Sequence, residues 1–102
     1  MPIFPAVWSF SIPWVTVKVL FPNDMDTGHS PSSIYFTVTI DGTPHEPQAP
    51  SWNGLRQLEM IHTLGGAPPT SVHLAYDGQD PLFLEQGNVT PVGAWSGGVA
   101  PE

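Results

Sequence analysis

The sequence predicts a mainly β protein: a small β-sandwich or barrel-like sheet of five to six short strands with one helix. Thirteen prolines and ten glycines interrupt a chain of 102 residues, and both residue types disfavour long helices. Several segments alternate apolar and polar residues with a period of two, which is the pattern of a half-buried strand. A chain of this length has room for one modest core, so we treat residues 1–102 as a single β-rich domain.

The clearest strand signal lies in residues 33–42. Its side chains alternate along the segment, and Asp41-Gly42 then supplies a tight turn. The apolar face comprises Ile34, Phe36, Val38 and Ile40. Residues 70–76 repeat this alternation, with Val72, Leu74 and Tyr76 on one face. We expect these two segments to contribute to the core.

The longest apolar segment, residues 6–21, changes phase at Pro13. Before the proline the apolar set is Trp8, Phe10 and Ile12, and after it the set is Val15, Val17, Val19 and Phe21. A shift by one residue moves apolar side chains to the opposite face, and proline cannot donate a ladder hydrogen bond. These facts predict a bulge or break at Pro13-Trp14, with the two halves in different sheets or the first half against a partner.

Residues 53–64 are the segment for which we predict a helix. Leucines and an isoleucine recur on one side of it, at positions 55, 58, 61 and 64. Ser51 or Asn53 can cap its start, and Gly65-Gly66 can end it. Before it, residues 43–50 read as extended, polyproline-like chain. After it, residues 82–84 predict a short strand, and residues 89–92 can pair back.

Both ends of the chain are rich in proline, glycine and alanine, which predicts extended arms at about residues 1–6 and 93–102. Trp8 and Trp95 lie near these arms, where an isolated domain has least with which to bury them. Buried aromatic anchors dominate many protein interfaces. We therefore expect an interface that contains Trp8, Phe10, Trp95 and Val99, whereas Trp14 and Trp52 are expected in the core or at its edge.

The charge composition indicates which partners the chain does not bind. Its formal net charge is −7, and its two basic residues are Lys18 and Arg56. Nucleic acids and anionic membranes both require clustered cations, so we expect neither partner. The chain has no cysteine, which excludes disulfides and thiolate metal sites. We expect no signal peptide and no membrane span, and therefore a cytoplasmic or virion location.

One triplet suggests chemistry. Asp26-Thr27-Gly28 resembles the Asp-Thr-Gly of retroviral-type aspartic proteases, which act as dimers with two aspartates sharing a proton. Here it follows Asn23-Asp24-Met25 rather than an apolar strand, and the family's Gly-Arg-Asn or Gly-Arg-Asp segment is missing. An aspartic protease dimer that uses Asp26 is therefore the hypothesis that we favour least, and we interpret the triplet as a plain turn. Neither a Gly-x-Ser-x-Gly elbow nor a lysine-containing phosphate loop occurs, so we expect no enzyme.

Metal binding has two candidate sources. The acidic loop at residues 23–28 can hold calcium through Asp24 and Asp26, although it fails the EF-hand pattern. The four histidines, His29, His45, His62 and His73, show no metal-ligand spacing. We assign no metal and no cofactor.

The sequence thus predicts a non-enzymatic structural or assembly subunit. A capsid decoration, head–tail or tail protein of a virion is one concrete form, with a homo-oligomer or a larger complex as its partner. The alternative is a ligand- or carbohydrate-binding module that uses Trp8, Trp52 or Trp95, because exposed aromatic rings stack on sugars.

Overall fold

The computed structural model describes residues 5–81, 83–84, 86–87 and 91–102. Eight strands run through these residues: β1 (Ala6–Ser11), β2 (Trp14–Leu20), β3 (Phe36–Ile40), β4 (Thr43–His45), β5 (Gln48–Trp52), β6 (Gln57–Thr63), β7 (Val72–Tyr76) and β8 (Trp95–Pro101). One 3₁₀ turn, η1 (Ser33–Tyr35), precedes β3. No helix in the described part of the chain has the length and apolar character to cross a membrane.

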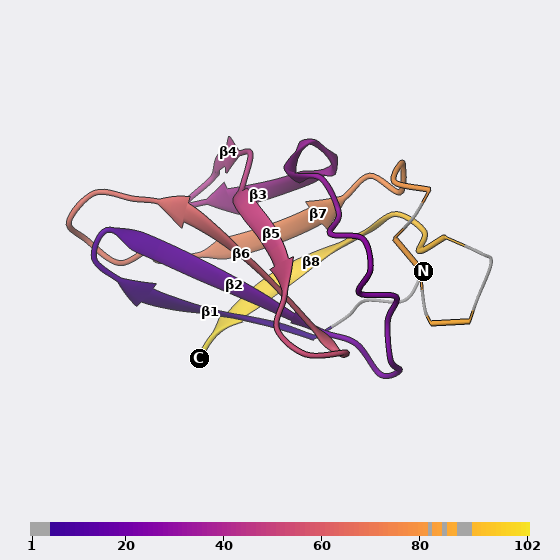
Figure 1. The fold of residues 1–102 in the computed structure, drawn as a ribbon. Helices are drawn as coiled ribbons and strands as arrows, with labels where there is room; N and C mark the ends of the chain where they lie inside the picture. Colours follow the sequence, from indigo (N-terminus) through magenta and orange to yellow (C-terminus); the bar gives the residue numbers. More distant parts are fainter. Residues whose placement is uncertain (1–4, 82, 85, 88–90) are drawn as a thin grey trace.

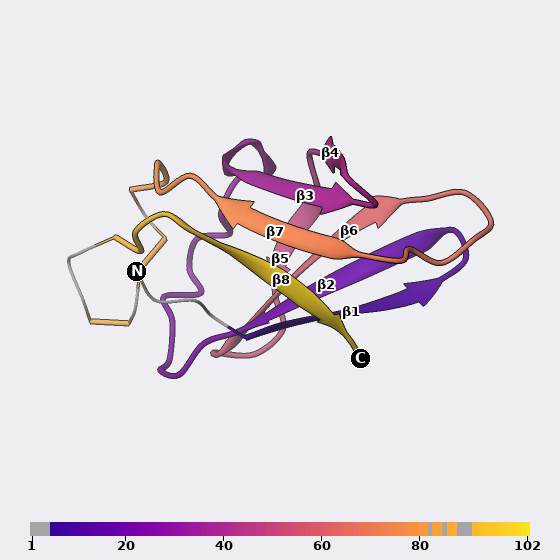
Figure 2. The ribbon, with the colours of Figure 1, turned by 180° about the vertical axis from the view of Figure 1, so that it is seen from behind.

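The strands form one sheet in the order β4-β3-β7-β8-β1-β2-β6-β5. All pairs are antiparallel except β1 with β8, which is parallel. The sheet curls into a half-barrel, so that β1, β2, β5 and β6 form one layer and β3, β4, β7 and β8 the other (Figures 1 and 2). With 52% strand and almost no helix, the mainly β class is confirmed. The expected five to six strands and one helix are wrong.

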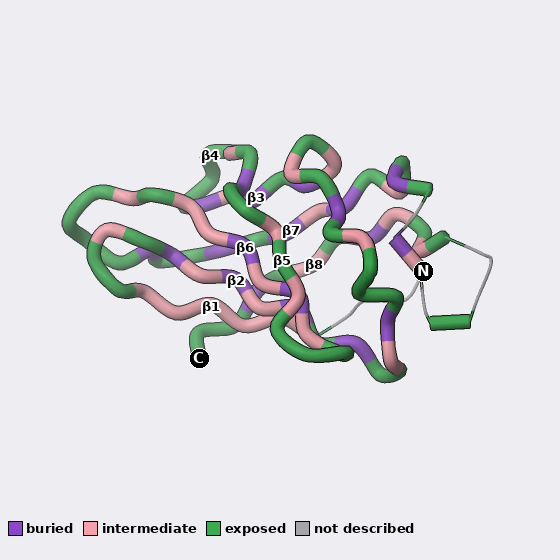
Figure 3. Tube along the Cα trace, viewed as in Figure 1, coloured by how far each residue is buried: buried purple, intermediate pink, exposed green. Residues whose placement is uncertain are grey.

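The core lies between the two layers, where the inward faces of the strands meet (Figure 3). Alternation places every second side chain inside, as expected for a sheet with one apolar face. The inward residues of β2 are Val15, Val17 and Val19, and those of β3 and β7 are Phe36, Val38, Ile40, Val72, Leu74 and Tyr76. The alternation predicted for these segments is confirmed except at Ile34, which lies in η1 and is 64% exposed.

Pro13 lies in a hairpin turn between β1 and β2, so the predicted break at this point is confirmed, whereas the alternative of a bulge and the separation into two sheets are wrong. The Ile12–Pro13 peptide is cis, and β1 and β2 pair directly, with Ser11 opposite Trp14 and Phe10 opposite Val15. Directly opposed residues of an antiparallel pair share a face. Across a two-residue turn, an even-numbered residue of β1 is therefore opposite an odd-numbered residue of β2 and shares its face. This explains why the apolar positions are even before Pro13 and odd after it.

The predicted helix at residues 53–64 is also wrong, because this segment forms β6 and the turn before it. Leu58 and Met60 are buried, Leu55 is 48% exposed, and Gly54 has a φ of 88°. The segment also alternates with a period of two, and β2 and β5 flank it on both sides. Strand formation depends on such neighbours more than on intrinsic preference.

The terminal arms and the polyproline-like segment differ from expectation as well. The C-terminal segment forms β8, which pairs with β7 on one side and β1 on the other. Residues 43–50 contribute β4 and most of β5. At the N-terminus β1 begins at Ala6, and residues 1–4 of the expected arm lie outside the described residues. So do Leu82, Glu85 and residues 88–90; next to them, Leu84 bridges Pro91.

Candidate functional site

The domain is elongated, with extents of 42 × 23 × 20 Å, and its notable features lie at its two ends. One end holds the β1–β2 turn and the loop between β6 and β7 (Figures 1 and 2). The other holds the segments that follow β2 and β7. We call the first end the hairpin tip, defined as residues 12–14 with 63–70.

The hairpin tip is apolar and exposed. Ile12 is 68% exposed and Trp14 is 49% exposed. The Leu64 N–H donates to the Pro13 carbonyl oxygen at 2.6 Å, which ties the turn to the loop. Residues 6–17 and 60–76 contain no Asp, Glu, Lys or Arg. At the base of the loop, the Asp41 carboxylate accepts hydrogen bonds from two backbone N–H groups, those of residues 70 and 71.

The four residues predicted for an interface do not form one exposed patch. Trp95 and Val99 are 4% and 7% exposed, buried within their own chain. The premise that an isolated domain leaves Trp95 exposed was wrong, because β8 lies inside the sheet. Trp8 and Phe10 are half-buried against the core.

Trp14 was misplaced in the opposite direction from Trp95, because it was expected in the core or at its edge and is 49% exposed. Its position beside the turn proline was the available signal, since side chains at a hairpin tip have few neighbours to bury them. Trp52, in contrast, packs at the core edge as predicted.

Six aromatic rings fill the core toward the opposite end. Phe36, Tyr76 and Trp95 lie side by side on three adjacent strands. Phe83 enters from the segment after β7, is fully buried, and lies 5.0 to 6.1 Å from five ring centroids: those of Phe21, Phe36, Trp52, Tyr76 and Trp95. Phe83 is therefore the centre of this aromatic cluster.

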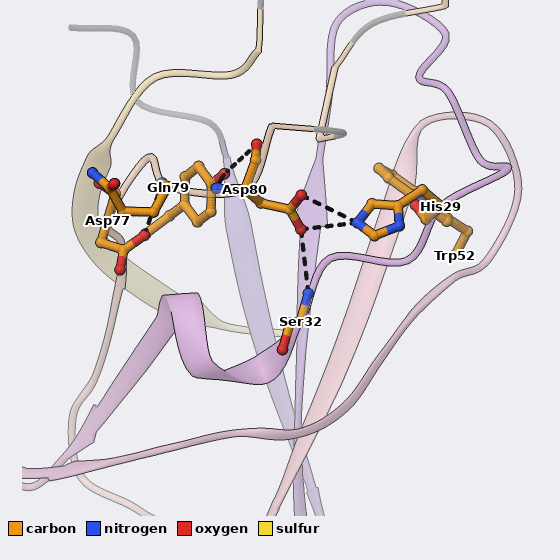
Figure 4. Close-up of polar contacts among 7 residues, drawn as sticks. His29, Ser32, Trp52, Asp77, Gln79 and Asp80 are labelled. Carbon is orange, nitrogen blue, oxygen red and sulfur yellow. Dashed lines mark hydrogen bonds and ion pairs between the residues drawn. The ribbon is translucent and has the colours of Figure 1, made fainter.

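A histidine–carboxylate pair borders the aromatic cluster (Figure 4). The His29 Nε2 atom lies 3.1 and 3.0 Å from the two carboxylate oxygens of Asp80. Asp80 is 3% exposed and also accepts a 3.4 Å hydrogen bond from the Ser32 N–H. The Trp52 indole N–H donates to the His29 carbonyl oxygen at 2.8 Å. Sequence reasoning missed this pair, because the two residues are 51 positions apart and show no motif.

Tyr76 completes the polar network at this end. Its hydroxyl accepts a hydrogen bond from the Asp80 N–H at 3.1 Å and donates to the Asp80 carbonyl oxygen at 3.4 Å. Burial, opposed by this backbone hydrogen bond and reinforced by nearby acidic groups, raises the pKa of Tyr76 to about 12. The phenol is thus neutral near pH 7.

Carboxylate–imidazole pairs occur in catalytic sites, where the carboxylate orients the imidazole toward a nucleophile or substrate. Here the contacts of His29 and Asp80 described above run to Ser32 through its backbone, to Trp52 through its indole and to Tyr76 through its hydroxyl. The Ser32 and Trp52 contacts join the segment after β2 to the segment after β7 and to β5, and the Tyr76 contact holds the segment after β7 against β7 itself. The pair therefore has the arrangement of a structural contact between loops.

A second histidine pair lies between the two layers. The rings of His45 on β4 and His62 on β6 stack, with centroids 4.2 Å apart and planes inclined by 28°. Burial, and to a lesser extent the neighbouring His45, lowers the pKa of His62. His73, the remaining histidine, is exposed on the outer face of β7, as its place in the alternation predicted.

The acidic loop at residues 23–28 directs its carboxylates toward its own chain. Asp26 accepts a 3.0 Å hydrogen bond from the Gly28 N–H, which is a local turn of the kind that we favoured for this triplet. Asp24 pairs with Arg56 at 2.7 Å. Among the described residues, no three His, Cys, Asp or Glu side chains gather in a way that can hold a metal ion.

Both basic residues of the chain are engaged with carboxylates. Lys18 pairs with Glu102 at 3.1 Å, and Arg56 pairs with Asp24. These exposed pairs contribute little to stability, but they partly neutralise the two cations.

Comparison with protein-family models, with curated proteins and with solved structures finds no match to this chain.

Proposed function

We propose that this chain is a non-enzymatic assembly subunit that contacts a second copy of itself through the hairpin tip. The observation that carries the proposal is the exposure of Ile12 and Trp14 on a tip without charged residues. Exposed apolar groups that gather in one place, rather than singly, mark interaction sites. Tryptophan is among the residues most enriched at the centres of protein interfaces.

Electrostatics favours the hairpin tip over other surfaces for self-association. The chain carries a formal net charge of −7, so two copies repel each other wherever their acidic groups meet. The tip residues contribute no charge of their own, and the Asp41 carboxylate at the base of the loop accepts hydrogen bonds from the N–H groups of residues 70 and 71. Contact between two tips also directs the opposite ends of two elongated domains away from each other.

The two edges of the sheet are poor alternatives. The edge strand β4 has only three residues, with Pro44 at its centre. The other edge strand, β5, contains Pro50, and its register shifts between Gln48 and Ser51, where Ala49 has a φ of 47°. Short strands, prolines and bulges all oppose edge-to-edge pairing.

We expect the association to be weak in isolation. A hairpin turn and part of one loop offer less surface than the roughly 800 Å² per partner of a standard interface. In an assembly that holds many copies, linked contacts of this kind reinforce one another.

Sedimentation velocity at increasing protein concentration tests the proposal. We expect reversible dimer formation at high micromolar to millimolar concentration, lost in Trp14→Ser and in Ile12→Ser. Ile34→Ser is the matched control, because Ile34 is 64% exposed but lies in η1, away from the tip. Added salt is expected to leave the association unchanged or to strengthen it, because salt screens the repulsion between acidic chains.

A strictly monomeric chain at all concentrations overturns the proposal. An equal effect of Ile34→Ser and Trp14→Ser also contradicts it. Binding to phosphatidylcholine vesicles through Trp14, without dimerisation, would assign the tip to a lipid surface instead.

A carbohydrate-binding module remains the second candidate, and Trp14 is the residue that favours it. Its ring is half exposed, whereas Trp8 and Trp52 pack against the core and Trp95 is buried. A glycan array with wild type and Trp14→Ser tests it. Glycan retention that disappears in Trp14→Ser supports this candidate, and absence of any signal ends it.

A further inference from the structure

The stacked pair of His45 and His62 connects parts of the sheet that are far apart in strand order. His45 lies on the edge strand β4, and His62 lies on β6, next to the opposite edge. Between β4 and β6 in the hydrogen-bonded order stand five other strands. The stack is therefore a direct side-chain contact between the two layers, across the interior of the half-barrel.

Both histidines are oriented toward the interior. His45 is paired with Val38 and His62 with Val15 in the antiparallel ladders. Val38 and Val15 are fully buried, and directly opposed residues share a face. The Nδ1 atom of His62 is buried and has no hydrogen-bond partner.

The charged groups on the neighbouring elements are directed elsewhere. Carboxylates that pair with a histidine stabilise its protonated form, so their partners decide the effect of pH. Asp41 on the β3–β4 turn accepts from the N–H groups of Thr70 and Ser71, and Glu46 after β4 accepts from the Ser33 hydroxyl. Glu59 on β6 accepts from the side chains of Asn53 and Gln57. Lys18 on β2 is paired with Glu102. On β7, His73 faces outward and is exposed.

We propose that the His45–His62 stack is a pH-sensitive contact between the two layers, closed while both rings are neutral and weakened when His62 takes up a proton. Protonation turns both ring nitrogens of His62 into donors, and its buried Nδ1 then carries an N–H without an acceptor. Burying an unpaired charged donor is unfavourable. Protonation of both rings adds repulsion between two cations at 4.2 Å.

The direction of the pH effect follows from the lowered pKa of His62. Its ordinary value is 6.5, and burial followed by the proximity of His45 lowers it in the folded state. Below about pH 6.5 the unfolded chain therefore binds a proton that the folded chain excludes. The contribution of the stack to the free energy of unfolding is complete above pH 6.5. It is lost as the pH falls from 6.5 through the folded-state pKa of His62.

Urea unfolding at pH 7.5 and pH 5.0 tests the proposal with three variants. His62→Phe and His45→Phe keep an aromatic ring but cannot take up a proton. His73→Gln is the control, because it removes a histidine from the exposed outer face of β7. We expect acidification to raise the unfolding constant of wild type more than that of His62→Phe. The ratio of the two constants is expected to grow by up to about tenfold for each pH unit. His73→Gln is expected to keep the wild-type dependence, and an equal dependence in wild type and His62→Phe overturns the proposal.

A measurement on the wild type covers the case in which a phenylalanine variant does not fold. An NMR titration of the imidazole signals gives the pKa of each histidine directly. A His62 pKa below 6.5 supports the proposal, and a value at or above 6.5 overturns it. Neither measurement depends on the hairpin tip, so a monomeric chain would leave this inference standing.

Discussion

His29 and Asp80 form a 3.0 Å contact between two loops at one end of the domain, although they are 51 positions apart in the sequence. The side chain of Asp80 is 4% exposed and that of His29 is 35% exposed, so the pair is buried on the carboxylate side and open on the imidazole side. A buried carboxylate is tolerated when hydrogen bonds satisfy its oxygens. The two loops therefore depend on each other for their conformation.

Replacing Asp80 is expected to destabilise the fold. Asp80→Asn puts an amide nitrogen where one of the two oxygens now lies, so at least one contact with His29 or with the Ser32 N–H is lost. Leaving a buried polar group unsatisfied costs about 1–3 kcal/mol, measurable by urea unfolding. Asp77→Asn is the control, because Asp77 is exposed and its amide analogue can still accept from the Gln79 N–H. Equal stability of the two variants contradicts this prediction.

Phe83 is expected to be the most sensitive position of the aromatic cluster. Phe83→Ala removes a fully buried ring that contacts five others, and such truncations cost about 3–5 kcal/mol. Phe83→Leu keeps part of the volume and is expected to lose less. Equilibrium unfolding with near-ultraviolet circular dichroism reports both stability and ring packing. Ile34→Ala, at an exposed site, should change neither, and a loss below about 1 kcal/mol for Phe83→Ala would show that the cluster repacks.

Gly78 and Gly42 provide a matched pair for testing close packing. Both have positive φ, 79° and 85°, so alanine costs roughly 1–2 kcal/mol of backbone strain at either site. At Gly78 a Cβ atom would also lie 2.8 Å from the backbone nitrogen of Ala94, whereas at Gly42 it meets nothing within 4 Å. Gly78→Ala is expected to lower the urea midpoint clearly more than Gly42→Ala does. Equal midpoints would mean that the segment before β8 can move aside.

Tyr76 predicts a loss of stability in alkali. Its pKa is raised from 10.0 to about 12 in the folded state, so between these values the unfolded chain gives up a proton that the folded chain retains. The contribution of neutral Tyr76 to the free energy of unfolding is therefore complete below pH 10 and falls as the pH rises from 10 toward 12. Absorbance at about 295 nm follows tyrosine ionisation, and the difference between wild type and Tyr76→Phe gives the step that belongs to Tyr76. A Tyr76 step at pH 10 in the folded protein would contradict the prediction.

The parts of the fold that the sequence predicted correctly are those set by local alternation. In β2, β3 and β7 the side chains that face the core are fixed by position within the strand, so Val17, Val38 and Leu74 were assigned correctly. The segment that forms β6 was ambiguous, because its residues satisfy a helical period and, through Leu58 and Met60, an alternating one. Only pairing with β2 and β5 decides between the two, and that pairing is not visible in a local window.

The candidate sites could not be predicted because they depend on contacts between distant segments. His29 meets Asp80, and His45 meets His62, only after the sheet has curled. β8 was missed because Gly97 and Gly98 weaken its strand signal, and its neighbours β7 and β1 supply the hydrogen bonds that define it. Trp95 was therefore assigned to a surface that the structure does not expose.

The parallel pairing of β1 with β8 has a consequence for the order of folding. Val7 pairs with Ala100, and the Glu102 N–H donates to the Trp8 carbonyl oxygen, so the two layers are joined by contacts that span nearly the whole sequence. Contacts of such long separation slow folding, because the intervening chain must be ordered before they form. On the ribosome, β1 and β2 can form their hairpin early. The sheet stays in two unjoined parts until the residues of β8 have left the exit tunnel, which leaves the adjoining edge of β1 open to other chains during synthesis.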